Sequence, residues 1–168
     1  DSALYLDPKS AVAHTASGHA LFSKYNYPDA RSHFRDALES NPRYAEALLG
    51  LARATWTDYA FPGERGEEVR SLLSRASQVW PDHPERWLLE GDIAFSSENW
   101  SRAEECYRKV LEIQPRHQIA QGLLGSILYA VARLEEFEEL RKKVEAEHPA
   151  PALFYVTLAE RLVDRFFY

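Results

Sequence analysis

Apolar and polar positions alternate along this 168-residue chain with the period of a helix rather than that of a strand. One stretch places its apolar side chains on a single helical face, at Ala103, Tyr107, Val110 and Leu111. A second stretch does the same at Leu48, Leu51 and Thr55. Because no segment shows the two-residue alternation of a strand, the pattern predicts an all-α fold.

One helical segment occurs twice in the sequence. Residues 26–42 and 99–115 agree in one register at six pairs of positions: Asn26 and Asn99, Tyr27 and Trp100, Ala30 and Ala103, Phe34 and Tyr107, Leu38 and Leu111, Pro42 and Pro115. Each Asn is expected at the bend that opens the segment, where its short polar side chain supplies local hydrogen bonds. Each Pro is expected to end the segment, because it lacks an amide donor and crowds the preceding turn.

Prolines extend this repetition over the whole chain. Successive spacings of 34, 39, 34 and 34 residues separate Pro8, Pro42, Pro81, Pro115 and Pro149. A small residue follows each proline by ten positions: Gly18, Ala52, Gly91, Gly125 and Ala159. A period of about 34 residues indicates stacked helical pairs. We interpret the small residues as points of close approach between the two helices of a pair, with aromatic side chains filling the remaining gaps.

These residues resemble the tetratricopeptide repeat, whose pattern runs aromatic, Leu-Gly, aromatic, Ala, aromatic, Ala and Pro. The fullest match is in the third unit: Trp87, Gly91, Trp100, Ala103, Tyr107 and Pro115. The resemblance implies a right-handed superhelical solenoid of antiparallel helix pairs. We predict one array over residues 1–168: the end of a preceding helix at 1–8, repeats at 9–44, 45–83, 84–117 and 118–151, and the first helix of a further repeat or a cap at 152–168.

The second repeat carries five extra residues, which fall in the sequence YAFPGERGEE. Pro62, Gly63 and Gly66 predict a loop there, and both a tolerated surface insertion and a protruding contact loop stay open. Because both ends of the chain fall within a repeat, and each repeat hides its apolar face against a neighbour, we expect the chain to be a fragment of a longer array.

The amino-acid composition limits the classes of partner that the chain is expected to bind. The chain has 26 acidic residues against 20 Lys plus Arg and no basic stripe, so we expect no nucleic-acid partner. It also has no apolar run near the ~20 residues of a transmembrane helix. The single Cys106 forms no internal disulfide and leaves the compartment unassigned. The cytoplasm is slightly favoured over a periplasmic or membrane-associated assembly.

The sequence offers no catalytic motif. His14 and His19 are five residues apart and diverge around a helix, so they make a poor metal pair, and we predict no metal and no cofactor. Cys106 lies beside two glutamates that oppose thiolate formation. The carboxylates of residues 135–139 run along one helix with bases following, as a solvated face does. We therefore predict that the chain is not an enzyme.

The resemblance places a binding groove on the first helices of successive repeats. The candidate contact residues are His19, Phe22, Arg53, Trp56, Asp92, Phe95, Ser126 and Tyr129. Their four aromatic side chains suit a peptide or helix in the groove, although packing between repeats is the alternative role. Acidic residues outnumber Arg53 on this face, which favours an apolar and basic partner segment over an acidic one, while a merely solvated groove stays open.

Family members that hold the C-terminal carboxylate of heat-shock chaperones use Lys, Asn and Arg on three successive first helices. The matching positions in this chain hold Thr15 and His19, Gly50, then Glu85 and Leu89, or, one repeat later, Leu49 and Arg53, Leu89, then Ile119 and Leu123. This departure argues against recognition of a chaperone tail.

Three functions are therefore considered. The leading hypothesis is a scaffold that binds a protein partner in its groove without chemistry of its own. The second is a docking arm of a larger enzyme whose catalytic domain lies outside this chain. The third is a structural element that self-associates through its cut or convex surfaces. Fold alone does not choose between them.

Overall fold

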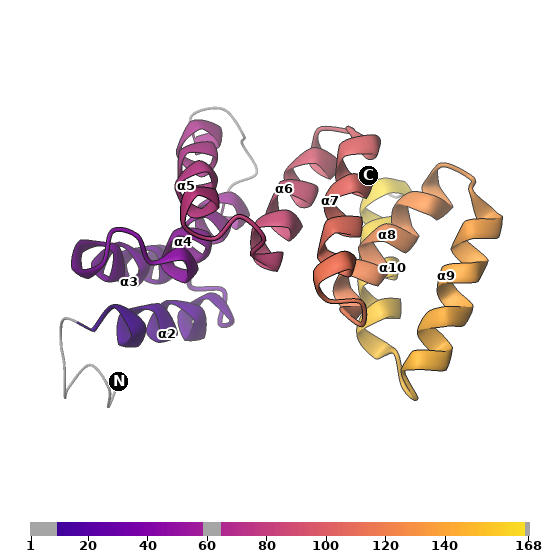
Figure 1. Ribbon diagram of the computed structural model, residues 1–168, viewed down its shortest axis with the longest axis horizontal. Coiled ribbons are helices and arrows are strands. Elements are labelled where there is room, and N and C mark those ends of the chain that lie inside the picture. The colour runs from indigo at the N-terminus through magenta and orange to yellow at the C-terminus, as the bar shows by residue number, and fades with distance from the viewer. Residues whose placement is uncertain (1–9, 59–64, 167–168) are drawn as a thin grey trace. The chain divides into compact units, whose positions relative to one another are not determined.

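The computed structural model describes residues 10–58 and 65–166, and within these ranges every regular element is an α-helix, as predicted. The helices are α2 (Ala11–Phe22), α3 (Tyr27–Ser40), α4 (Ala45–Thr57), α5 (Arg65–Val79), α6 (Pro84–Ser96), α7 (Trp100–Ile113), α8 (Gln118–Ala130), α9 (Leu134–Glu147) and α10 (Ala152–Phe166) (Figure 1). The predicted preceding helix at 1–8 lies outside the described residues, as does Pro62. Gly66, which we expected in the inserted loop, belongs to α5.

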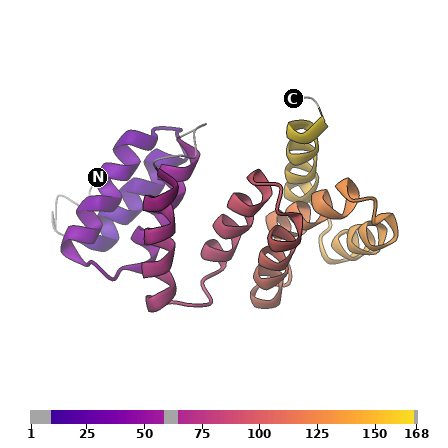
Figure 2. The same ribbon diagram turned by 90° about the horizontal axis from the view of Figure 1, so that it is seen from above.

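The chain forms two compact units, residues 1–86 and 87–168, and α6 contributes to both. In unit 1, α2 packs on α3, and α4 packs on α2, α3 and α5; Figures 1 and 2 both show α2 and α3 side by side. In unit 2, α8 packs on α7, α9 and α10. We call α2, α4, α6, α8 and α10 the first helices, and α3, α5, α7 and α9 the second helices.

Three of the helical pairs share one turn. Tyr25, Glu98 and Ala132 each have a positive φ, of 60°, 56° and 58°. The next amide bonds a carbonyl five residues back: Asn26 to Leu21, Asn99 to Ala94 and Arg133 to Leu128. This is the Schellman arrangement, which ends a helix with a left-handed residue and satisfies its last carbonyls. The turn therefore recurs in backbone conformation although its residues differ.

The repeated asparagines begin the second helices, as predicted. The Asn26 side chain accepts a hydrogen bond from the Asp29 amide at 3.4 Å, and Asn99 accepts one from the Arg102 amide at 3.2 Å. Both are N-caps, which satisfy amide groups that have no partner within the helix. The two copies of the repeated segment are thus equivalent helices of 14 residues each.

An aromatic ring from a second helix fills the core of each unit. Phe34 is fully buried, and a Cβ added at Gly50 or Gly18 would lie 2.4 or 2.7 Å from its ring. Tyr107 is likewise buried, and a Cβ added at Gly91 would lie 2.4 Å from it. These contacts confirm that Gly18 and Gly91 permit close approach.

Gly125 does not follow this rule, so our interpretation of that position is wrong. A Cβ there would lie 3.5 Å from the Phe154 ring, an ordinary contact. The close approach in this part of unit 2 is instead at Gly122, where a Cβ would lie 2.7 Å from the Phe154 carbonyl oxygen. The need for a small residue falls at Gly122 because the backbone of α10, at Phe154, packs against α8 at that position.

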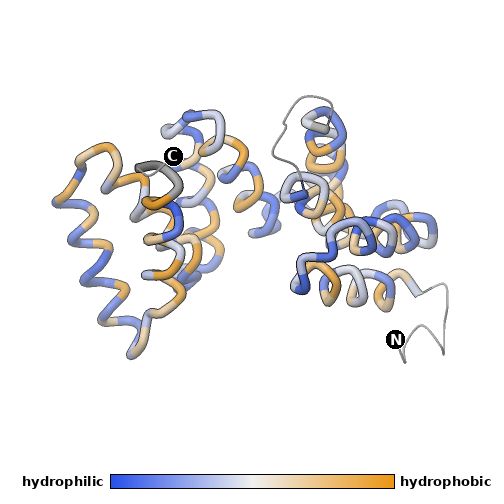
Figure 3. Tube along the Cα trace, turned by 180° about the vertical axis from the view of Figure 1, so that it is seen from behind, coloured by the Kyte–Doolittle hydropathy of each residue, from blue (hydrophilic) through white to orange (hydrophobic). Residues whose placement is uncertain are grey.

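Hydropathy follows this packing (Figure 3). The trace of α9 is mostly hydrophilic and buries Phe137 and Val144, whereas α8, between its neighbours, buries nine consecutive residues, from Ala120 to Leu128. Cys106 is also buried, in α7. Among the described helices, none combines the length and apolar character needed to cross a bilayer.

Candidate functional site

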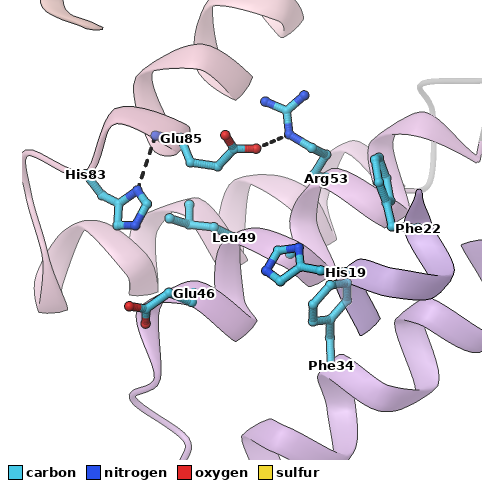
Figure 4. A pocket seen from close by; sticks show the side chains of 9 residues that line it. His19, Phe22, Phe34, Glu46, Leu49, Arg53, His83 and Glu85 are labelled. Carbon is cyan, nitrogen blue, oxygen red and sulfur yellow. Dashed lines mark hydrogen bonds and ion pairs between the residues drawn. The ribbon is translucent and has the colours of Figure 1, made fainter. Parts of the chain in front are cut away.

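Unit 1 contains a pocket of about 280 Å³ on its first helices (Figure 4). Side chains from α2 and α4, from the turn before α6 and from the first turn of α6 line it, with Phe34 of α3 behind them. The lining residues are His19, Phe22, Phe34, Glu46, Leu49, Gly50, Arg53, His83 and Glu85. Three of the predicted contact residues, His19, Phe22 and Arg53, are therefore brought together.

The inner wall of the pocket is apolar. Phe34 and Leu49 are buried, and Gly50 lies against the Phe34 ring, so the backbone of α4 contributes to the wall directly. The His19 ring meets Phe34 edge-on, with centroids 5.1 Å apart. Phe22 packs against Tyr27 at 5.2 Å and stays partly exposed. These rings form a preformed apolar surface along one side of the pocket.

The rim of the pocket is polar and mostly acidic. Arg53 forms an ion pair with Glu85, whose backbone amide also donates a 3.2 Å hydrogen bond to His83 Nδ1. Figure 4 shows both contacts on the same side of the pocket. Glu46 projects from the first turn of α4 and has no ion-pair partner among the described residues. The rim therefore offers one carboxylate to an incoming positive charge.

Burial shifts the pKa of both pocket histidines in the direction that favours the neutral ring. Burial lowers the pKa of His19 below its ordinary value of 6.5, against the opposing effects of Glu85 and Glu46. Burial also lowers the pKa of His83, against the same two carboxylates. Because the neutral rings do not offset the rim carboxylates near pH 7, the rim remains net negative there.

The corresponding residues of unit 2 are engaged with one another. The Tyr107 hydroxyl donates to Asp92 at 3.0 Å, and the Arg161 guanidinium of α10 pairs with the same carboxylate at 2.7 Å. Burial, followed by the charge of Asp92, raises the pKa of Tyr107 far above its usual range, so the phenol remains a donor. Arg161 also lies 5.1 Å from the centroid of Phe95, whose ring packs edge-on against Trp100. Asp92 and Phe95 thus meet partners within unit 2.

Of the other predicted contact residues, Trp56 is half-buried at the end of α4 and does not line the pocket. Tyr129 is 46% exposed and contacts Phe137 edge-on. Ser126 is only 1% exposed, and its hydroxyl donates to the Leu123 carbonyl at 2.7 Å. It lies within the run of buried residues of α8, from Ala120 to Leu128.

Sequence reasoning missed His83 as a member of the pocket. It lies in the turn between α5 and α6, outside the helical positions from which the groove was predicted. Its signal was available in the PDHPE stretch, where the ring is two residues before the acidic Glu85. Phe34 was assigned to packing, and it both packs and forms the back of the pocket.

The fold and the pocket define an all-helical repeat scaffold. A family model described as tetratricopeptide repeat matches residues 15–79, and another of the same description matches residues 84–117, together more than half of the chain. The chain therefore belongs to the tetratricopeptide repeat family. Its fold is a typically non-catalytic scaffold, and domains of this family generally mediate protein–protein interactions.

Known proteins agree with this family assignment. Hsp70-Hsp90 organizing protein 1 of Glycine max is 28% identical over 114 residues, which are 68% of this chain but 19% of the relative. A thermophilic TPR protein of Thermus thermophilus superposes with a TM-score of 0.79 at 20% identity, covering 96% of this chain and 86% of that one. The first TPR of Spaghetti, solved with the HSP90 peptide SRMEEVD, superposes at 0.62 with 18% identity, covering 74% of this chain and 97% of that one. The chain thus spans about a fifth of the curated relative's length.

Proposed function

We propose that this chain is a non-catalytic scaffold whose unit 1 pocket binds a partner segment that is apolar and positively charged. The observation that supports this most directly is the pocket itself, which joins an apolar wall to a carboxylate without an ion-pair partner among the described residues. Phe22 and Glu46 both line the pocket (Figure 4). The proposed ligand is a segment with a large apolar side chain and a Lys or Arg nearby.

The apolar wall would supply most of the affinity. An apolar side chain seated against Phe22 and Leu49 is removed from water, at roughly 25 cal/mol for each Å² buried. Aromatic residues contribute large contact area with few rotors to immobilise. Phe22 is therefore the expected hot spot of the pocket.

The charged rim would select the partner. Glu46 would attract a Lys or Arg of the ligand, whereas Arg53 already pairs with Glu85. An acidic segment such as SRMEEVD, the peptide solved with Spaghetti, would meet the Glu46 carboxylate and neutral histidines instead of a cationic clamp. Like charges at close range disfavour binding, so the proposed partner is not an acidic tail.

The remaining predicted contacts are proposed as secondary. Trp56 and Tyr129 keep exposed ring surface and could extend the contact within their own units. Phe95 would contribute once the Arg161 guanidinium moved from its ring. We assign no ligand contact to Ser126, which is buried, or to Asp92, which serves the pair with Arg161.

A displayed random-peptide library selected on the purified chain tests this proposal. Enriched peptides are expected to combine an aromatic or aliphatic residue with Lys or Arg. Fluorescence anisotropy of a labelled enriched peptide should then show affinity falling about tenfold in Phe22→Ala and in Glu46→Lys, the latter less at high salt. Glu39→Lys, an equal charge change at an exposed position of α3, is the matched control.

SRMEEVD, labelled in the same way, should bind more weakly than the enriched peptides. Enrichment of acidic peptides, or an affinity unchanged in both Phe22→Ala and Glu46→Lys, would show that the partner segment does not occupy this pocket.

A further inference from the structure

We infer that the first helical pair holds a site for a divalent transition metal ion, formed by His14, His33 and Asp36. This site is separate from the pocket of unit 1, none of whose lining residues it shares. His14 lies on α2, and the other two residues lie three positions apart on α3. The inference does not depend on the proposed binding function.

The donor atoms lie at the spacing that a metal ion requires. His14 Nδ1 is 3.2 Å from His33 Nδ1 and 3.6 Å from an Asp36 carboxylate oxygen, and the three donors lie within 4.8 Å of one another. Two ligand atoms of a tetrahedral zinc ion, each about 2.0–2.1 Å from the metal, stand roughly 3.3 Å apart. The two separations from His14 Nδ1 are close to this value, and the third, between His33 and Asp36, lies within 4.8 Å and would shorten as the ion binds.

The packing of the helices brings these groups together before any metal binds. His33 and Asp36, three residues apart, lie on the same side of α3, and α2 packs along that helix. The His14 side chain is only 13% exposed, whereas Asp36 is 44% exposed. A largely buried imidazole fixes one ligand, and the exposed carboxylate leaves an open side for entry and for a water molecule in the fourth position.

The electrostatics also favour a cation. His14 Nδ1 and His33 Nδ1 lie 3.2 Å apart, so one neutral ring can donate its Nδ1 proton to the other, and a metal ion that takes the place of this proton would meet a lone pair from each ring. Asp36 adds a negative charge beside them and so favours a divalent ion over a shared proton. Two imidazoles and one carboxylate suit Zn²⁺ and its neighbours rather than Ca²⁺ or Mg²⁺, which prefer oxygen ligands.

The histidine pairing was not visible along the sequence. In the sequence, the histidine nearest to His14 is His19, five residues away on the same helix, where the two rings diverge. The partner of His14 comes from the opposite helix, 19 residues away. A metal ion there would link α2 to α3 in the way a covalent clip would, and would stabilise unit 1.

Zinc binding to the intact chain tests the inference. After treatment with EDTA and dialysis, calorimetric titration with ZnCl₂ should give one ion per chain, with saturation in the micromolar range. Co²⁺ should produce the intense visible absorption of a four-coordinate site. His33→Ala and Asp36→Asn should each weaken zinc binding by at least about tenfold. His148→Ala in unit 2 and Glu39→Gln on α3 are the matched controls and should leave it unchanged.

A measurement on the unmodified chain keeps the test decisive if a variant folds poorly. In the histidine ring NMR spectrum, one equivalent of Zn²⁺ should shift the signals of His14 and His33 and leave those of His117 and His148 in place. Zinc should also raise the melting temperature of the unmodified chain, by at least about 5 °C at saturation. No saturable binding, or ring shifts confined to other histidines, would overturn the inference and leave a proton-sharing pair.

Discussion

The first helices of the two units use equivalent repeat positions in opposite ways. In unit 1, His19 and Arg53 follow the small residue of their repeats and line an open pocket. In unit 2, Asp92 occupies the same repeat position but pairs with Arg161. The guanidinium of Arg161 also lies over the Phe95 ring. One fold can therefore leave an aromatic ring accessible or cover it with its own cation, as Arg161 covers Phe95.

This comparison teaches that a repeat position does not by itself define a binding residue. Phe22 and Phe95 are equivalent, and each packs edge-on or tilted against the aromatic residue that begins the next helix. They differ in the group that lies against the ring: Arg161 lies over Phe95, whereas Phe22 lines the pocket. The following predictions test that difference, beginning with the largest expected effect.

Phe34 should be the side chain on which unit 1 depends most. Its ring contacts both Gly18 and Gly50, so Phe34→Ala would leave a cavity between three helices. We expect a loss of about 3–5 kcal/mol in unfolding free energy. Urea denaturation with native-state hydrogen exchange should show unit 1 opening first. Phe22→Ala, at a partly exposed ring, should cost much less; equal losses would contradict the assigned packing.

Gly91→Ala and Gly125→Ala should change stability in opposite directions. The new methyl group at Gly91 would lie 2.4 Å from the Tyr107 ring, which is buried and hydrogen-bonded to Asp92. We expect a loss of about 1–3 kcal/mol. At Gly125 the nearest atom is 3.5 Å away, so the helix preference for Ala should give a gain of up to about 1 kcal/mol. The urea midpoints of the two variants measure this contrast.

Removing Arg161 should weaken unit 2 and uncover Phe95. The Asp92 side chain is 12% exposed and the Arg161 side chain 27%, so solvent screens the pair only in part. We expect Arg161→Ala to cost about 1–2 kcal/mol of unfolding free energy. Arg108→Ala, which breaks the more exposed pair with Glu104, is the control and should cost less than about 1 kcal/mol. An Arg161→Ala loss no larger than that of the control would contradict the role assigned to the pair.

Acidification should destabilise unit 1 through its two pocket histidines. Burial places the folded-state pKa of His19 and His83 below 6.5, so the unfolded chain takes up protons first as the pH falls. Their stabilising contribution is fully present above pH 6.5 and is lost as the pH falls through the folded pKa. Denaturation between about pH 7.5 and 5.5 should show this decline, and His19→Gln with His83→Gln should flatten it. If stability fell equally with pH in the double variant, other titratable groups would be responsible for the loss.

The smallest effect is expected at the left-handed turns. Ala132→Gly should increase stability by about 0.5–1 kcal/mol, because glycine adopts a positive φ without the steric strain of a Cβ. Tyr25→Gly in unit 1 should give a similar gain, apart from its loose ring contact with Tyr27. Thermal denaturation of both variants measures the change, and a loss in both would contradict the turn conformation.

The helices and their caps could be predicted because their signals are local. Asn26 and Asn99 begin equivalent helices. The spacing of Gly18 and Gly91 from the prolines predicted points of close helix approach, but not that the Phe34 and Tyr107 rings would lie against them. The site could be predicted only in part. His19, Phe22 and Arg53 were found from their repeat positions, but His83 lies in a turn that the repeat pattern does not specify.

Longer-range pairings escaped prediction for a physical reason. Asp92 and Arg161 are 69 residues apart, and their contact depends on how three successive first helices stack. The burial of Ser126 is likewise set by tertiary packing, since it lies within a run of nine consecutive buried residues of α8. His14 and His33 meet across a helix pair whose relative rotation is set by packing, which residue spacing does not encode.

The left-handed turns have a practical consequence. Tyr25, Glu98 and Ala132 share neither size nor charge, yet all three are exposed in one backbone conformation. The turn between the two helices therefore forms with side chains of different chemistry at this position. It provides three exposed positions of the same backbone conformation at which a fluorophore or cross-linker can be attached.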